Sequence, residues 1–101
     1  MERDVVKRIR AALAARGAWT IKIHGSVFQP RGTPDIIGCI QGRLFAFEVK
    51  EDRHEPPDDL QAYNLGLIRA AGGVVATVYS ADDALSVLRN AGVIDGTSEV
   101  G

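Results

Sequence analysis

The chain has 101 residues, 46% hydrophobic and 25% charged, which is the length and composition of one ordinary globular domain. No apolar run is long enough to cross a bilayer, so we expect no membrane segment. The net charge of −1 hides an uneven distribution: residues 1–50 hold nine Lys and Arg against four Asp and Glu, and residues 51–101 hold three against nine. The basic half favours a polyanionic partner, although scattered solvated charges would give the same counts.

The first half of the chain predicts one helix followed by three strands. Apolar residues recur at helical spacing over residues 2–16, and Gly17 is a typical helix end. Alternating apolar and polar residues over 19–24 predict a half-buried strand. Two further strands over 35–40 and 43–50 are joined by a two-residue turn, so the three strands can form an antiparallel meander.

The second half predicts a helix, a strand and a last helix. Residues 56–71 begin with prolines and acids typical of a helix start and then carry apolar side chains on one stripe, namely Leu60, Tyr63, Leu67 and Ala71. Residues 74–79 are nearly all apolar and predict a buried strand, and 80–92 predict the last helix. A right-handed crossover should place the fourth strand parallel to a neighbour, which gives an α/β fold with a mixed sheet flanked by helices.

Glu48 and Lys50 are unusual because they lie two residues apart on a strand with apolar neighbours. Their side chains therefore share one face of the predicted sheet. Burying a charge is costly unless another group pairs with it. A cross-strand ion pair or a charged sheet edge would also account for these two residues, so they do not by themselves define a site.

Asp35 opens the strand that a hairpin joins to the strand of Glu48, so the two carboxylates can be neighbours. Turn chemistry after Pro34 is the alternative explanation for Asp35. Two close carboxylates repel each other, and a divalent cation such as Mg²⁺ or Mn²⁺ relieves the repulsion. Glu2, on the inward stripe of the first helix, is a possible third carboxylate, unless it only complements the helix dipole. No Cys and His cluster has zinc spacing.

In chain order, Gly32-Thr33-Pro34-Asp35 and Glu48-Val49-Lys50 resemble the signature of the PD-(D/E)xK nucleases. An acid in the first helix and Gln61 in a later helix extend the match, and the whole set resembles the virus-type replication-repair nuclease (VRR-NUC) domain of the stand-alone phage type. The resemblance implies a restriction-endonuclease-like αβββαβ(α) core. It further implies a nuclease domain over residues 1–93, and we expect residues 94–101 to form a disordered tail.

The same resemblance implies roles for individual residues. Glu2, Asp35, Glu48 and the backbone carbonyl of Val49 would bind Mg²⁺ or Mn²⁺, with Asp4 as the alternative to Glu2. Lys50 would position or polarise the attacking water, and Gln61 would support the site. No organic cofactor is expected. The candidates for DNA contact are basic residues of the first half: Lys7, Arg8, Arg10, Lys22, His24, Arg31 and Arg43. His24 could equally be an ordinary surface residue of a strand.

We therefore expect a metal-dependent DNA endonuclease, structure-selective on branched DNA such as Holliday junctions. We also expect a homodimer, with interface candidates at Val27-Phe28, Leu85, Leu88 and Val93-Ile94. The alternative is that these residues simply belong to the core, above all Leu85 and Leu88. A non-catalytic DNA-binding or assembly module with the same fold is one alternative, and a chain that binds metal only for stability is another. The charged N-terminal residues do not resemble a signal peptide, and the single cysteine, Cys39, fits a reducing cytosol. The phage-type resemblance implies the cytoplasm of a bacterium or a phage-infected cell.

Overall fold

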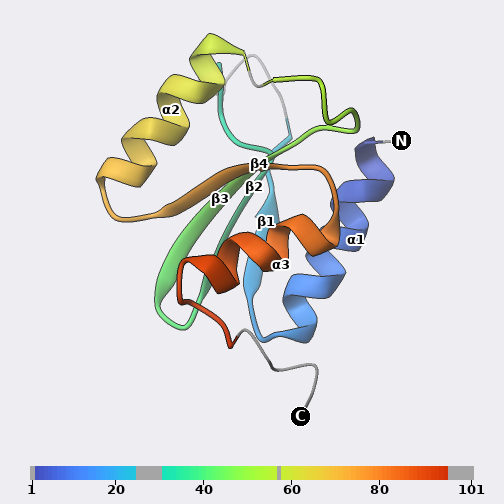
Figure 1. The fold of residues 1–101 in the computed structure, drawn as a ribbon, viewed down its shortest axis with the longest axis vertical. Helices are drawn as coiled ribbons and strands as arrows, with labels where there is room; N and C mark the ends of the chain where they lie inside the picture. Colours follow the sequence, from blue (N-terminus) through green and yellow to red (C-terminus); the bar gives the residue numbers. More distant parts are fainter. Residues whose placement is uncertain (1, 25–30, 57, 96–101) are drawn as a thin grey trace.

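The computed structural model describes residues 2–24, 31–56 and 58–95, apart from the side chain of Glu2. Figure 1 shows the helices and strands of these residues arranged around one sheet. Their bounds are α1 Glu2–Ala15, β1 Trp19–Lys22, β2 Ile36–Ile40, β3 Arg43–Val49, α2 Asp59–Ala70, β4 Val74–Val78 and α3 Ala81–Asn90. The order of elements is the one predicted from the sequence, and the α/β fold class is confirmed.

The sheet has the strand order β1-β2-β3-β4. β1, β2 and β3 form the predicted antiparallel meander, and β4 pairs with β3 in parallel after the crossover through α2. Gln41 and Gly42 connect β2 to β3 with φ values of 51° and 76°, as a type I′ hairpin turn requires. This turn sets a register in which Ile36 lies opposite Phe47.

Two layers of helices cover the sheet: α1 and α3 lie on one face, and α2 lies on the other (Figure 1). The larger core cluster lies between the sheet and the first pair of helices and contains Phe45, Phe47 and Val49. Ala46 faces the opposite way and packs with Leu65 and Val75. The alternation along β3 thus sends odd-numbered residues towards α1 and α3 and even-numbered residues towards α2.

The apolar stripe that spacing indicates on α2 is not the buried face of that helix. Leu65 and Ile68 pack against the sheet. Leu60, Tyr63 and Leu67 instead remain 44%, 63% and 52% exposed. The main contacts of α2 are with β3 and β4, so β1, at the far edge of the sheet, is also left open on this side. The exposed side chains of Trp19 and Ile21 lie on that strand.

Four of the expected dimer-interface residues belong to the core. Leu88 is fully buried, and Leu85, Val93 and Ile94 are partly buried side chains that pack against the larger cluster. The core interpretation is therefore confirmed for Leu88, which α3 directs towards the sheet, and Leu85, Val93 and Ile94 direct part of their apolar surface to the same core. Val27 and Phe28 lie outside the described residues, as do residues 96–101 of the tail expected over 94–101, whereas Ile94 of that tail packs against the core. Within the described part of the chain, no helix has the length and hydrophobicity that a membrane crossing needs.

Candidate active site

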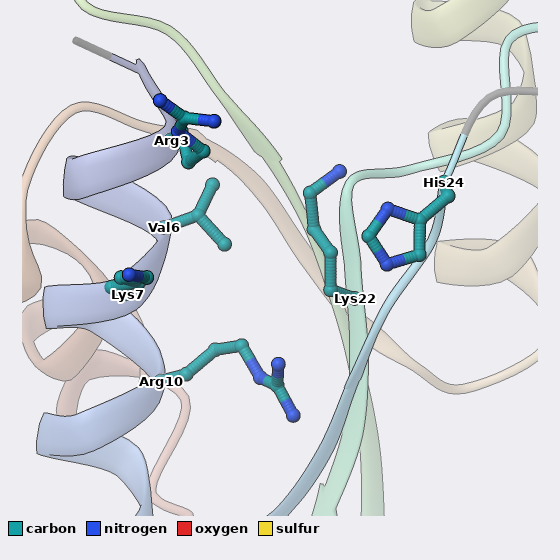
Figure 2. A pocket seen from close by; sticks show the side chains of 6 residues that line it. All are labelled: Arg3, Val6, Lys7, Arg10, Lys22 and His24. Carbon is teal, nitrogen blue, oxygen red and sulfur yellow. The ribbon is translucent and has the colours of Figure 1, made fainter.

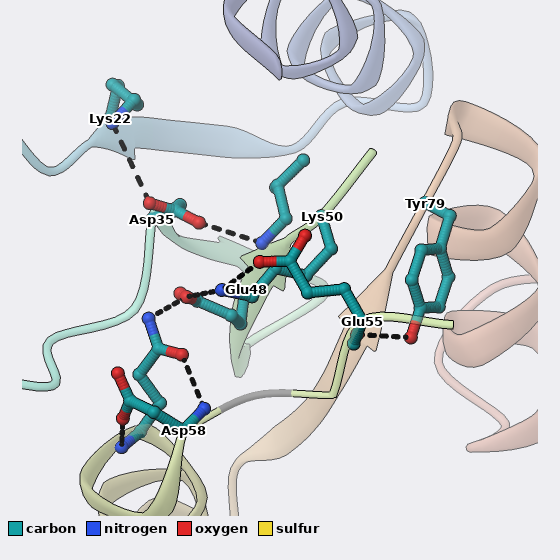
Figure 3. Close-up of polar contacts among 9 residues, drawn as sticks. Lys22, Asp35, Glu48, Lys50, Glu55, Asp58 and Tyr79 are labelled. Atoms are coloured by element: carbon teal, nitrogen blue, oxygen red, sulfur yellow. Dashed lines mark hydrogen bonds and ion pairs between the residues drawn. The ribbon is translucent and has the colours of Figure 1, made fainter. Parts of the chain in front are cut away.

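Asp35 and Glu48 lie at adjacent ends of β2 and β3. The pairing of Ile36 with Phe47 places Asp35 across from Glu48 one step further along the ladder. An Asp35 carboxylate oxygen accepts a 2.8 Å hydrogen bond from the backbone amide of Val49 (Figure 3). The structure therefore brings the Asp35 side chain and the Glu48-Val49 backbone together, as the hairpin predicts.

Gly32 lets the loop before Asp35 pack closely against α2. Its φ is +80°, and a Cβ at this position would lie 2.7 Å from both Asn64 Nδ2 and Leu60 Cγ. Such a distance is too short for any larger residue. Asn64 Nδ2 also donates a 3.1 Å hydrogen bond to the Arg31 carbonyl, which ties the loop to the helix. The position of Asp35 is thus set from both sides, by β1 and β3 in the sheet and by α2 through the loop.

Glu48 is 2% exposed, although its carboxylate is charged at neutral pH in water. Two side chains contact one of its oxygens: Gln61 donates a hydrogen bond from its amide, and Lys50 Nζ lies 3.7 Å away. An ammonium and an amide donor are the groups that a buried carboxylate needs. Glu48 therefore contacts both Lys50 and Gln61, two residues that the sequence also predicts to belong to the site. Figure 3 shows Lys50 beside Glu48.

Gln61 also caps α2. Its side-chain oxygen accepts a 3.0 Å hydrogen bond from the Asp58 amide, and its own backbone amide donates a 2.8 Å bond to the Asp58 carboxylate. This reciprocal pair is a capping box. The oxygen of the Gln61 amide therefore holds the helix start while its nitrogen holds Glu48, so the cap fixes the orientation of a site residue.

Two partners of the site residues are not evident from the sequence. Lys22 Nζ lies 3.9 Å from Asp35, and Lys50 Nζ lies 3.5 Å from the Glu55 carboxylate. Lys22 is expected from the sequence to contact DNA, with no link to Asp35. Glu55 lies in a polar loop whose path the sequence pattern does not predict, so no periodicity could have placed it at the site.

The loop over 51–56 is fastened to the end of β4 and the start of α3. Arg53 forms a 3.1 Å ion pair with Asp83, and its guanidinium lies 5.2 Å from the centre of the Tyr79 ring. The Tyr79 hydroxyl in turn donates a 3.4 Å hydrogen bond to the Glu55 carbonyl. These contacts hold Glu55 beside Lys50 and close one side of the site.

The donor set suits a hard divalent cation. Asp35 and Glu48 supply carboxylate oxygens, and the Val49 backbone lies beside them; water can complete the coordination of Mg²⁺ or Mn²⁺. Among the residues whose side chains the structure describes, no group of three or more His, Cys, Asp and Glu is placed to hold a metal. The side chain of Glu2 lies outside this description, and its role remains a prediction.

A basic pocket lies on the other side of β1, between that strand and α1 (Figure 2). It has a volume of about 450 Å³. Its lining residues are Arg3, Val6, Lys7, Arg10, Lys22 and His24. Four of the predicted DNA-contact residues are therefore in one place, and Arg3 joins them. The spacing of Arg3 with Lys7 and Arg10 on one helix face is a signal that could have identified it.

The other predicted DNA-contact residues lie outside this pocket. Arg8 and Arg31 are exposed. Arg43 lies at the opposite end of β3 from Glu48, where its Nε donates a 2.9 Å hydrogen bond to the Gly72 carbonyl. Their proposed contact with DNA remains a prediction.

Comparisons with known proteins identify the fold. No protein-family model and no curated protein matches the sequence. The structure is similar to a solved "VRR_NUC domain", with a TM-score of 0.73 and 26% identity, covering 87% of this chain and 94% of that one. It is also similar to Hjc, a Holliday junction resolvase from Archaeoglobus fulgidus, with a TM-score of 0.59 and 18% identity, covering 74% and 64%. The second match shows the fold alone. The resemblance read from the sequence is confirmed: the chain has the fold of a VRR_NUC domain, which is a PD-(D/E)xK nuclease fold.

Proposed function

We propose that the protein is a Mg²⁺- or Mn²⁺-dependent endonuclease that hydrolyses phosphodiester bonds in DNA. The observation that carries this proposal is the convergence of Asp35, Glu48 and Lys50 at the adjacent ends of β2 and β3. The fold supports the proposal, because the chain shares it with a solved VRR_NUC domain. The order of the three residues along the chain also resembles the PD-(D/E)xK signature.

In this proposal Asp35, Glu48 and the Val49 carbonyl hold the cation, and Glu2 is a further candidate ligand. A bound cation would supply positive charge to the scissile phosphate and acidify a water molecule. Lys50 would hold the attacking water and add positive charge where the transition state becomes more negative. Gln61 would keep the Glu48 carboxylate in one orientation, because its amide is fixed by the start of α2.

DNA is the proposed substrate because the basic pocket lies next to this site. Lys22 lines the pocket and is also the residue whose ammonium lies near Asp35. Phosphate groups are the anions that DNA offers along its whole length. For branched DNA the support is the fold that the chain shares with a protein described as a Holliday junction resolvase.

The proposed active form is a homodimer. Paired cuts across a symmetric junction need two identical sites in a fixed relation, which a twofold dimer provides. The exposed apolar side chains on α2 and β1 offer a surface for this contact: Trp19, Ile21, Leu60, Tyr63 and Leu67. Specific DNA complexes usually bury roughly 1,000 Å² or more of protein surface. A second copy of this small domain would help the protein to reach that area.

The rival function is a non-catalytic DNA-binding module that keeps the nuclease fold. One observation favours it: each carboxylate of the site already has a lysine ammonium within 4 Å, at 3.9 Å for Asp35 and 3.7 Å for Glu48. Because the two ammonium groups already offset the carboxylate charges, such a site is stable without a bound metal ion. It would bind DNA and leave the strands intact.

A cleavage panel separates these functions. The purified protein is incubated with duplex, flap and four-way-junction DNA of matched sequence, with Mg²⁺, with Mn²⁺ and with EDTA. We expect cleavage that requires the metal and is fastest on the junction. Binding to all three substrates without any cut would establish the rival function, and equal cleavage of duplex and junction would refute the preference for branched DNA.

A further inference from the structure

Five basic side chains face one cavity beside the active site. Arg3, Lys7 and Arg10 extend from one face of α1, and Lys22 and His24 extend towards them from β1 and the residues that follow it (Figure 2). Among the residues whose side chains the structure describes, no Asp or Glu lines the cavity. The four Lys and Arg cations gathered in this way repel one another, and an anion inside the cavity would relieve that repulsion.

Arg10 is held in place at the pocket wall. Its Nε donates a 3.0 Å hydrogen bond to the Thr20 hydroxyl, and a terminal nitrogen donates a 3.3 Å bond to the Thr20 carbonyl. The guanidinium still has other N–H groups to offer. A side chain that is already ordered loses less entropy when it binds a phosphate group.

Lys22 is shared between the pocket and the active site. It lines the cavity, and its ammonium lies 3.9 Å from Asp35 Oδ1, near the outer limit for an ion pair. Its shorter contact is a 2.7 Å hydrogen bond to the carbonyl of Ile23. The ammonium is therefore loosely associated with Asp35 and is within reach of an anion in the cavity.

We propose that the basic pocket binds a phosphate group of the DNA strand and that this phosphate draws Lys22 away from Asp35. The proposal rests on the proposed function for the identity of the substrate. While Lys22 lies beside Asp35, its positive charge opposes a divalent cation there. Once the phosphate attracts the ammonium, Asp35 becomes a better metal ligand, so DNA in the pocket prepares the site for its cation.

The coupling must be reciprocal, because two ligands that share one lysine change each other's affinity by the same factor. Replacing Lys22 by methionine removes the charge and keeps most of the side-chain length. The variant should bind the cation more tightly than the parent when no anion is present. In this variant an anion in the pocket should no longer change the affinity of the site for the divalent cation through residue 22.

The test measures Mn²⁺ affinity without DNA, by calorimetry, with sodium sulfate as the phosphate analogue and sodium chloride at equal ionic strength as the reference. In the parent we expect sulfate to tighten Mn²⁺ binding, by about fivefold for a coupling at the low end of the usual range. In Lys22→Met we expect tighter Mn²⁺ binding in chloride and little further gain from sulfate. Lys22→Arg keeps the charge and should retain the coupling, and thermal melting checks that each variant is folded.

A second measurement addresses the pocket itself, using junction DNA in EDTA so that no cation contributes. Lys7→Gln should weaken DNA binding several-fold more than Arg69→Gln, which removes one positive charge from an exposed position on α2. Equal losses from these two variants would overturn the pocket assignment. An equal effect of sulfate in the parent and in Lys22→Met would overturn the coupling. Neither result depends on cleavage, so failure here is distinct from failure of the proposed nuclease activity.

Discussion

Lys50 stabilises a carboxylate that water cannot reach. Glu48 is 2% exposed, and Lys50 Nζ lies 3.7 Å from its carboxylate. We expect Lys50→Met, in the absence of metal, to lower the free energy of unfolding by about 2 kcal/mol. The reason is that the buried Glu48 carboxylate loses the ammonium that compensates its charge. The Gln61 hydrogen bond keeps the loss from being larger. Urea denaturation in EDTA measures it.

Glu55→Gln is the matched control, since it removes the other carboxylate near Lys50. Unlike Glu48, the Glu55 side chain is exposed. Its effect should stay within about 0.5 kcal/mol. If the two variants are equally stable, the Lys50 ammonium does not compensate the buried charge of Glu48.

At the scale of residues, the sequence predicts contacts that follow from backbone periodicity. Strand alternation places Glu48 and Lys50 on one face, and the short hairpin brings Asp35 to the same end of the sheet. The sequence does not predict that Lys22 lies near Asp35 or that Glu55 lies near Lys50. Those contacts depend on how a long side chain bends and how a loop is anchored, and neither leaves a periodic pattern.

The start of α2 links helix capping to the site. Asp58→Ala removes the carboxylate that accepts a hydrogen bond from the backbone amide of Gln61. We therefore expect the free energy of unfolding to fall by about 1 kcal/mol. Because the Gln61 side chain also holds Glu48, we further expect cleavage to slow by about tenfold, as for other groups that orient metal ligands.

Val87→Ala is the control for this prediction. Val87 is a partly buried side chain of α3 that packs against the larger core cluster, and it lies beside Arg43, at the end of β3 opposite Glu48. We expect a similar loss of stability and no change in cleavage rate. A comparable slowing in both variants would mean that the α2 cap acts through general stability and does not orient Glu48.

At the scale of elements, the order and type of helices and strands follow from the sequence, but the buried face of α2 does not. Periodicity indicates the stripe of Leu60, Tyr63 and Leu67, whereas the structure buries Leu65 and packs the partly buried Ile68 beside it. The helix is oriented by the capping box and by Gln61 at Glu48, which require Gln61 to face the sheet. A polar contact at the helix start thus overrides the apolar pattern.

For the whole molecule, the exposed apolar surface predicts how two copies associate. We expect Leu67→Glu to convert a dimer into a monomer, because it places a charge in the middle of the apolar stripe of α2. Ser86→Glu adds the same charge at an exposed position of α3 and should leave the dimer intact. Light scattering gives the mass of each variant. A parent protein that is a monomer at high concentration, or a Leu67→Glu variant that remains dimeric, contradicts this assignment.

The central claim is that Glu48 belongs to a metal-dependent catalytic site, and one comparison tests it most directly. Cleavage of a four-way junction in Mg²⁺ is measured for the parent, for Glu48→Gln and for Glu51→Gln, which removes an exposed carboxylate from the loop that follows. We predict that Glu48→Gln is folded and at least about 100-fold slower, while Glu51→Gln cleaves at the parent rate. A folded Glu48→Gln variant that cleaves as fast as the parent would contradict the claim.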